Sequence, residues 1–147
     1  LRVAAGPMSP RAFAHLMPAE AVLWARWLTQ HPGEYDRFAY DVRVGRGRPV
    51  PAGTPGNVAR DWEILTKQRI DVVGFRGLEP TLFEVAPRGG RAAFGAIELY
   101  GELYRETFAW EGPLPLALVV GAIHPAFLRI AAQRGITVYI LPIEEGG

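Results

Sequence analysis

Apolar residues recur with helical spacing in three stretches of the chain. Residues 18–31 form a broad apolar face and end in His-Pro-Gly, residues 91–108 carry two adjacent apolar stripes, and residues 124–135 end at Gly135. Apolar periodicity closed by a helix breaker is typical of helices that pack on a core. We therefore expect three helices in these stretches.

Five other stretches have the pattern of strands. Residues 34–44 alternate between polar and apolar positions, which predicts a half-exposed strand with every odd-numbered side chain from 35 to 43 on one face. Residues 69–75 and 81–86 are nearly continuous apolar runs joined by a tight turn, and residues 116–122 and 136–142 read in the same way. Such runs are typical of strands covered on both faces.

This order of elements, α-β-β-β-α-β-α-β, predicts an α/β fold with a small mixed sheet and helices on both faces. The late strands flank a helix and should be parallel, whereas the early strands should form a meander. We expect one domain at residues 18–142, with an N-terminal arm at 1–17 and a C-terminal tail at 143–147. Residues 45–57 are rich in Gly and Pro and predict a long flexible loop, and the segment that follows is either helical or extended.

Composition narrows the classes of function. The chain has 147 residues, 49% of them hydrophobic, and its formal net charge of +1 creates no global field that would demand nucleic acid. The absence of cysteine excludes disulfides, thiolate zinc sites and cysteine nucleophiles. No stretch reaches the ~20 apolar residues of a membrane-spanning helix, and the first residues lack the apolar core of a signal peptide, so we expect no membrane partner. The chain starts at Leu1 rather than Met, for which we expect processing, an alternative start codon or an omitted residue.

Two acids stand on the predicted hairpin, Asp71 on its first strand and Glu84 on its second. Cross-strand neighbours lie close together, and Mg²⁺ is commonly held by one or two carboxylates and water. The pair therefore predicts a metal site. Two alternatives stay open: Asp71 could cap the backbone or pair with Arg69 or Arg91, and Glu84 could be a single buried acid that the backbone satisfies.

The run RIDVVGF, then LFEVAP, then RAAFGAIELYGELY, with a helix before it, resembles the PD-(D/E)XK nuclease superfamily, in particular small phage-encoded members. The resemblance covers residues 18–142 and implies a restriction-endonuclease-like core with the order α-β-β-β-α-β. It also implies that Asp71 and Glu84 are the metal ligands, with Glu20 on the first helix as a further acid.

The chain departs from the family pattern at two polar positions. The family's lysine stands two residues after the second acid, where this chain has Ala86, and a glutamine on the following helix is replaced by Ala96. Loss of one positioned group that stabilises a transition state typically costs ~10²–10³ in rate. The resemblance therefore implies a vestigial site with Asp71, Glu84, Ala86 and Ala96 and little chemistry.

Three functions follow from these observations. The first is a non-catalytic structural protein with a degenerate nuclease fold, implied by the resemblance to be a phage virion component of the portal, neck or tail region. We expect it to be a homo-oligomer without cofactor that contacts other virion subunits, in the virion or in the host cytoplasm before assembly. The second is a Mg²⁺-dependent DNA nuclease, and the third is a DNA-binding module that does not cleave. Four arginines are the candidate contacts with nucleic acid or a protein partner: Arg46, Arg48, Arg88 and Arg91.

Overall fold

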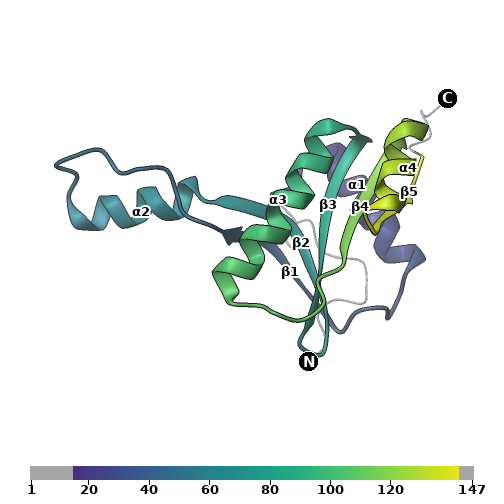
Figure 1. The fold of residues 1–147 in the computed structure, drawn as a ribbon, viewed down its shortest axis with the longest axis horizontal. Helices are drawn as coiled ribbons and strands as arrows, with labels where there is room; N and C mark the ends of the chain where they lie inside the picture. The colour runs from purple at the N-terminus through teal and green to yellow at the C-terminus, as the bar shows by residue number, and fades with distance from the viewer. Residues whose placement is uncertain (1–14, 143–147) are drawn as a thin grey trace.

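The computed structural model of the protein describes residues 15–142, with residues 64–66 described by their backbone alone. Within this range the chain forms four helices and five strands, drawn as a ribbon in Figure 1. In chain order the elements are α1 (Pro18–Gln30), β1 (Arg37–Val44), α2 (Gly56–Thr66), β2 (Gln68–Arg76), β3 (Glu79–Gly89), α3 (Arg91–Phe108), β4 (Leu116–Ile123), α4 (Pro125–Gln133) and β5 (Ile136–Ile140). The predicted α/β class is confirmed. Within residues 15–142, no helix has the length and apolar character needed to cross a bilayer.

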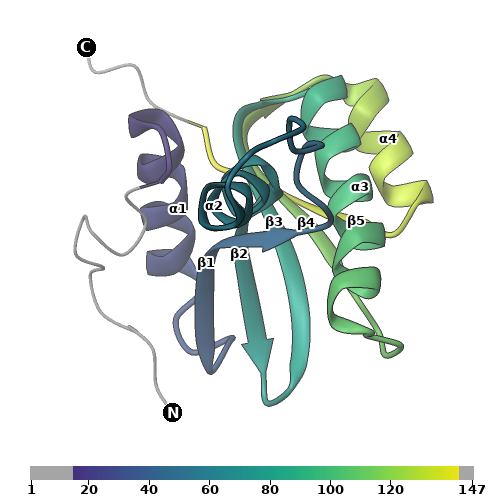
Figure 2. The same cartoon turned by 90° about the vertical axis from the view of Figure 1, so that its left-hand side faces the viewer.

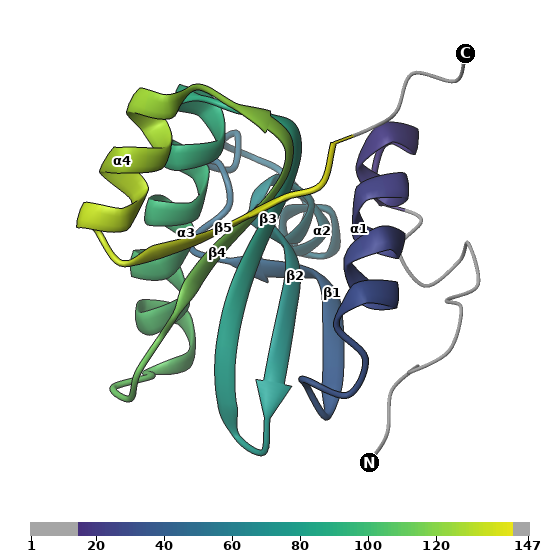
Figure 3. The same cartoon turned by 90° about the vertical axis from the view of Figure 1, so that its right-hand side faces the viewer.

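The sheet has five strands in the order β1-β2-β3-β4-β5. Strands β1, β2 and β3 pair antiparallel as a meander, whereas β3, β4 and β5 pair parallel. Helix α1 covers one face of the sheet, and helices α3 and α4 cover the other (Figures 2 and 3). The predicted strand directions and the placement of helices on both faces are therefore confirmed.

Each face of the sheet has its own apolar core. The core under α1 is aromatic: Trp24 and Trp27 stack with their ring centroids 4.9 Å apart, and both meet Phe83 edge to face. The indole N–H of Trp24 also donates a hydrogen bond of 3.1 Å to the Tyr40 hydroxyl, the kind of partner that a buried indole N–H needs. The core under α3 and α4 is mainly aliphatic, with Leu82 among its fully buried side chains.

Strands β1 and β2 exchange faces midway along their length. Tyr40 packs in the core under α1 but Val42 in the core under α3, and the opposite strand repeats the change between Val72 and Ile70. The cause lies at Asp41, which has a φ of 55° and interrupts the alternation. The expectation that the odd-numbered side chains from 35 to 43 all lie on one face is therefore wrong.

The segment between β1 and β2 projects from the body of the molecule (Figure 1). The predicted loop at 45–57 is too long by two residues, because α2 begins at Gly56, and the undecided stretch after the loop is helical. We call residues 43–69 the projecting arm. Its base is fixed by the pairing of Val44 with Gln68 and by a hydrogen bond of 2.8 Å from the N–H of Gly45 to Thr107 Oγ1 on α3.

The ends of the domain are partly outside the described residues. Of the expected N-terminal arm, positions 1–14 lie outside the described range, and the expected tail at 143–147 lies outside it entirely. Leu16, the second described residue, is buried in the aromatic core under α1. Toward the C-terminus, His124 caps helix α4 by accepting a hydrogen bond of 3.0 Å from the N–H of Ala126.

Candidate metal site at the fork of strands β2 and β3

Strands β2 and β3 separate at the two acids. Their pairing runs from the turn to Val72 opposite Phe83. Beyond that point β2 continues beside β1 into the projecting arm, while β3 continues beside β4 toward α3 (Figure 1). Asp71 and Glu84 are the next residues on the two strands and lie at this fork.

Asp71 is held in place by backbone contacts on both sides. Its Oδ2 accepts a hydrogen bond of 2.9 Å from the N–H of Val85, which lies on β3 beyond the point where β2 and β3 stop pairing. Its own carbonyl oxygen lies 3.0 Å from Nε2 of His15. Arg69, which could have paired with this acid, instead contacts Asp41 with 3.4 Å between Nε and Oδ1. Asp71 therefore caps the backbone, as one of the sequence alternatives predicted. This hydrogen bond uses one of its two carboxylate oxygens.

Glu84 lies half-buried next to Asp71. Burial, together with a side-chain hydrogen bond to Asp71 and the charges of Asp71 and Glu20, raises the pKa of Glu84 to about 10. Two carboxyls this close in a poorly solvated place cannot both be ionised at low cost. At neutral pH the Glu84 carboxyl therefore stays protonated. The alternative in which Glu84 is a single acid satisfied by the backbone is wrong.

Glu20 is a third acid whose charge reaches the fork. It stands in the first turn of α1, where its Oε1 accepts a hydrogen bond of 3.0 Å from the N–H of Met17. Even so, no group of three or more His, Asp or Glu side chains within residues 15–142 is close enough together to hold a metal ion. The donor set at the fork is thus two carboxylates, with Glu20 acting through its field.

The donor chemistry at the fork fits a small hard cation. Mg²⁺ takes oxygen ligands and retains several waters, so two carboxylates on adjacent strands are a sufficient protein contribution. Softer metals favour thiolate or clustered imidazole ligands. The chain has no cysteine, and the described residues hold no cluster of histidines.

Tyr100, in one of the apolar stripes predicted for residues 91–108, is a further residue of the candidate site. Burial raises the pKa of its hydroxyl to about 12, helped by the charges of Glu84 and Asp71 and opposed by Arg69. The hydroxyl therefore stays protonated and can donate a hydrogen bond near the acids. Its position one turn after Ala96 on α3 is the only sequence signal that could have indicated it.

The two alanines at the expected polar positions lie on β3 and α3. Ala86 follows Glu84 by two residues on β3 and packs against the aliphatic core under α3. Ala96 is half-buried on α3. Neither position supplies a charge or a hydrogen-bonding side chain.

The four arginines predicted as contacts fall into two groups. Arg46 and Arg48 lie on the projecting arm, whereas Arg88 and Arg91 lie in the body, at the end of β3 and the start of α3 (Figure 1). All four are exposed. The structure therefore gives two basic positions on the arm and two in the body.

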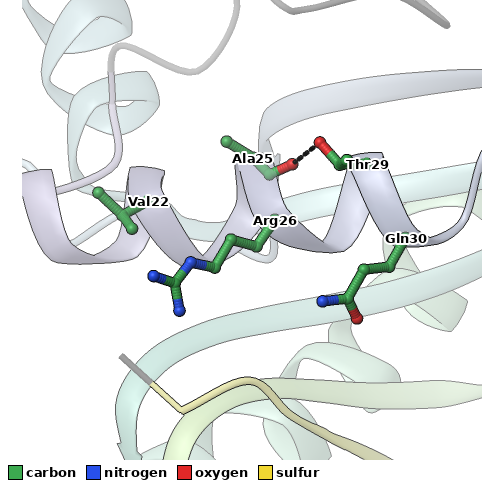
Figure 4. Close-up of a pocket in the computed structure, with 5 residues that line it drawn as sticks. All are labelled: Val22, Ala25, Arg26, Thr29 and Gln30. Carbon is green, nitrogen blue, oxygen red and sulfur yellow. Dashed lines mark hydrogen bonds between the residues drawn. The ribbon is translucent and has the colours of Figure 1, made fainter. Parts of the chain in front are cut away.

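A groove of about 350 Å³ lies along the outer face of α1 (Figure 4). Its lining is mostly apolar and holds no acid: Val22, Ala25, Arg26, Thr29 and Gln30. Arg26 Nη1 donates a hydrogen bond of 2.5 Å to the carbonyl oxygen of Pro142, so its charge is engaged with the last described residue. This groove lacks the groups for acid-base or metal chemistry, and the fork is the better candidate site.

Comparison with known proteins gives similarity of fold without a family. No protein-family model matches the chain, and no curated protein matches it. One similar solved structure is described as "Structure of EndoMS-dsDNA2 complex", with 13% identity, a TM-score of 0.48, and coverage of 89% of this chain and 48% of that one. Another is the crystal structure of a repair endonuclease from Pyrococcus abyssi, with 13% identity, a TM-score of 0.44, and coverage of 92% and 47%. The chain spans about half the length of both, and the similarity assigns no activity to it.

Proposed function

We propose that this chain binds a divalent cation through Asp71 and Glu84 and cleaves phosphodiester bonds of DNA. The supporting observation is the pair of carboxyls, Asp71 and Glu84, that lie next to each other where β2 and β3 stop pairing. A pair of acids brought together in a partly buried place reduces stability unless a cation binds, so such pairs are typical of functional sites. A fold kept for shape alone has no need of this arrangement.

The cation would be Mg²⁺ or Mn²⁺. When bound, such an ion polarises a phosphodiester and makes water a better nucleophile at neutral pH. The chain's own contribution is to fix the ligands. Asp71 is held through Val85 and His15, and Glu84 is held by the pairing of β3 with β4.

Tyr100 supplies the remaining polar group of the site. Its protonated hydroxyl is suited to donate a hydrogen bond to a phosphate oxygen at the fork. At position 86, where the family pattern has a lysine, this chain has an alanine that packs against the apolar core, so no positive charge is present there. The expected enzyme is therefore slow, by ~10²–10³ relative to one with that positive charge in place.

A second function, a non-catalytic interaction protein, is favoured by the same two alanines. In that case the acids would be a remnant, and the fold would serve contacts with other subunits or with DNA. The virion setting, the homo-oligomeric state and the subunit partners remain predictions from the sequence resemblance alone.

A cleavage assay separates the two functions. Purified protein is incubated with supercoiled and linear duplex DNA and with Mg²⁺ or Mn²⁺, next to Asp71→Asn, which retains an oxygen for the N–H of Val85 but removes the charge. Glu102→Gln, on the exposed surface of α3, is the matched control. We expect slow metal-dependent cleavage by wild type and the control and none by Asp71→Asn. Equal DNA breakdown by all three, or none by any of them, would contradict the proposal.

A further inference from the structure

Positive charge is concentrated on the projecting arm. Residues 43–69 hold six of the 16 basic residues of the chain and two of its 15 acidic residues, which gives the arm a net charge of +4 and the remainder −3. The overall charge of +1 hides this separation. Such a segregated basic segment attracts polyanions at short range even when the whole protein is nearly neutral.

The basic surface begins next to the acid pair. Arg43 and Arg69 face each other across β1 and β2 at the base of the arm, which places two positive charges on neighbouring strands. Arg69 precedes Asp71 by two residues, and its charge acts on the Tyr100 hydroxyl at the fork. Lys67 precedes Arg69 by two residues. An anion bound at the base of the arm would therefore lie beside the candidate metal site.

The outer part of the arm continues this charge away from the body. Arg46 and Arg48 are exposed on the connection that leaves β1, and Arg60 is exposed on α2. Helix α2 stands away from the sheet and covers neither of its faces (Figures 1 and 2). Its 11 residues span about 16 Å, roughly half a helical turn of B-DNA. The arm thus has the length to follow a nucleic-acid backbone.

We propose that the projecting arm lies along the sugar-phosphate backbone of a DNA duplex and holds it against the fork. The proposal rests on the proposed function, because it supplies the substrate on which the acid pair would act. Arginine binds phosphate through a planar pair of donors. Contacts of this kind position a duplex without reading its sequence, so the arm binds duplexes of different sequence equally.

The experiment measures how DNA binding depends on salt. A short labelled duplex is titrated with the full chain in EDTA over a series of KCl concentrations, and the logarithm of the binding constant is plotted against that of the salt concentration. Each phosphate contact contributes about 0.9 to the slope. We therefore expect Arg46→Ala with Arg60→Ala to reduce the slope by ~1.8. The matched double variant, Arg129→Ala with Arg134→Ala on and after α4, should leave it unchanged.

Three results would overturn the inference. These are no binding by wild type, equal slopes for the arm and control variants, or a strong dependence on duplex sequence. Helix α2 also exposes Val58, 48% accessible, so the arm could instead join two copies of the chain. An unchanged slope in the arm variant, with Val58→Asp turning a dimer into a monomer, would establish that alternative. Because EDTA removes the metal, failure of the acid site leaves this slope intact, and failure of the arm leaves metal binding intact.

Discussion

Replacing Glu84 by glutamine should stabilise the protein, and more so as the pH rises. Glutamine keeps a donor for Asp71 but carries no proton to lose. In wild type the pKa of Glu84 rises from its ordinary value of 4.5 to about 10 in the folded protein. Between these values the folded state binds one proton more than the unfolded state, so the free energy of unfolding falls by about 1.4 kcal/mol per pH unit.

The size of the effect follows from that window. At pH 7 the wild-type chain has crossed roughly 2.5 pH units of it, which corresponds to an upper value of about 3 kcal/mol. This is a large part of the ~5–15 kcal/mol that holds a domain together. Stability linked to Glu84 is therefore complete below the unfolded pKa and is lost progressively toward the folded one. The glutamine variant lacks this loss.

Urea denaturation in EDTA at about pH 5, 7 and 9 measures the difference directly. We expect the stability gap between Glu84→Gln and wild type to widen across the series. Glu102→Gln, an exposed carboxylate on the same protein, should follow wild type at every pH. Parallel pH profiles for wild type and Glu84→Gln would show that the Glu84 carboxyl has its ordinary pKa in the folded protein, which would contradict the raised pKa.

Further predictions concern the site and the core. Ala86→Lys restores a cation on the face of β3 that carries Glu84 and should raise metal-dependent cleavage by ~10²-fold, while Ala86→Met, similar in bulk, should not; an equal change in both would refute the role of charge. Trp24→Phe removes the hydrogen bond to the Tyr40 hydroxyl, whereas the buried Nε1 of Trp27 has no hydrogen-bond partner among the described residues. In thermal denaturation, Trp24→Phe should therefore cost about 1 kcal/mol more than Trp27→Phe, and the reverse order would contradict this. Gly74→Ala would place a Cβ 2.9 Å from the ring of Tyr35, so urea denaturation should show a loss of ~1–3 kcal/mol, and an unchanged midpoint would show that the ring moves aside.

The elements with strong periodicity could be predicted from the sequence. Helix α3 begins and ends as predicted, and the apolar runs of β2, β3 and β4 lie within the observed strands. Trp24 and Trp27 are both fully buried, in agreement with the broad apolar face predicted for residues 18–31. In these stretches the secondary structure that the local apolar pattern favours is also the one that buries those residues in the fold.

The parts that escaped prediction depend on tertiary structure. Asp41 adopts a left-handed conformation, which is uncommon in residues other than glycine and which the alternating pattern of residues 34–44 did not indicate, and the faces of β1 change there. Helix α2 starts with Gly56 and Asn57, residues typical of turns, so its first turn reads as loop. Tyr100 belongs to an apolar stripe, and its polar role arises only because α3 brings its hydroxyl close to the two acids.

The relation of the acids to each other illustrates the same division. The hairpin spacing placed Asp71 beside Glu84, since β2 and β3 are joined by a short turn. The separation of the strands at that point depends on the parallel pairing of β3 with β4 and on the departure of β2 into the arm. The sequence thus indicated which residues form the candidate site, whereas the fork at which they lie is a property of the whole sheet.

Calorimetric titration with Mn²⁺ measures directly whether Asp71 and Glu84 bind a metal ion. We expect wild type and Glu102→Gln to bind one ion per chain and Asp71→Asn combined with Glu84→Gln to bind none. Equal binding by all three proteins, or no binding by wild type, would show that the acid pair at the fork is not a metal site.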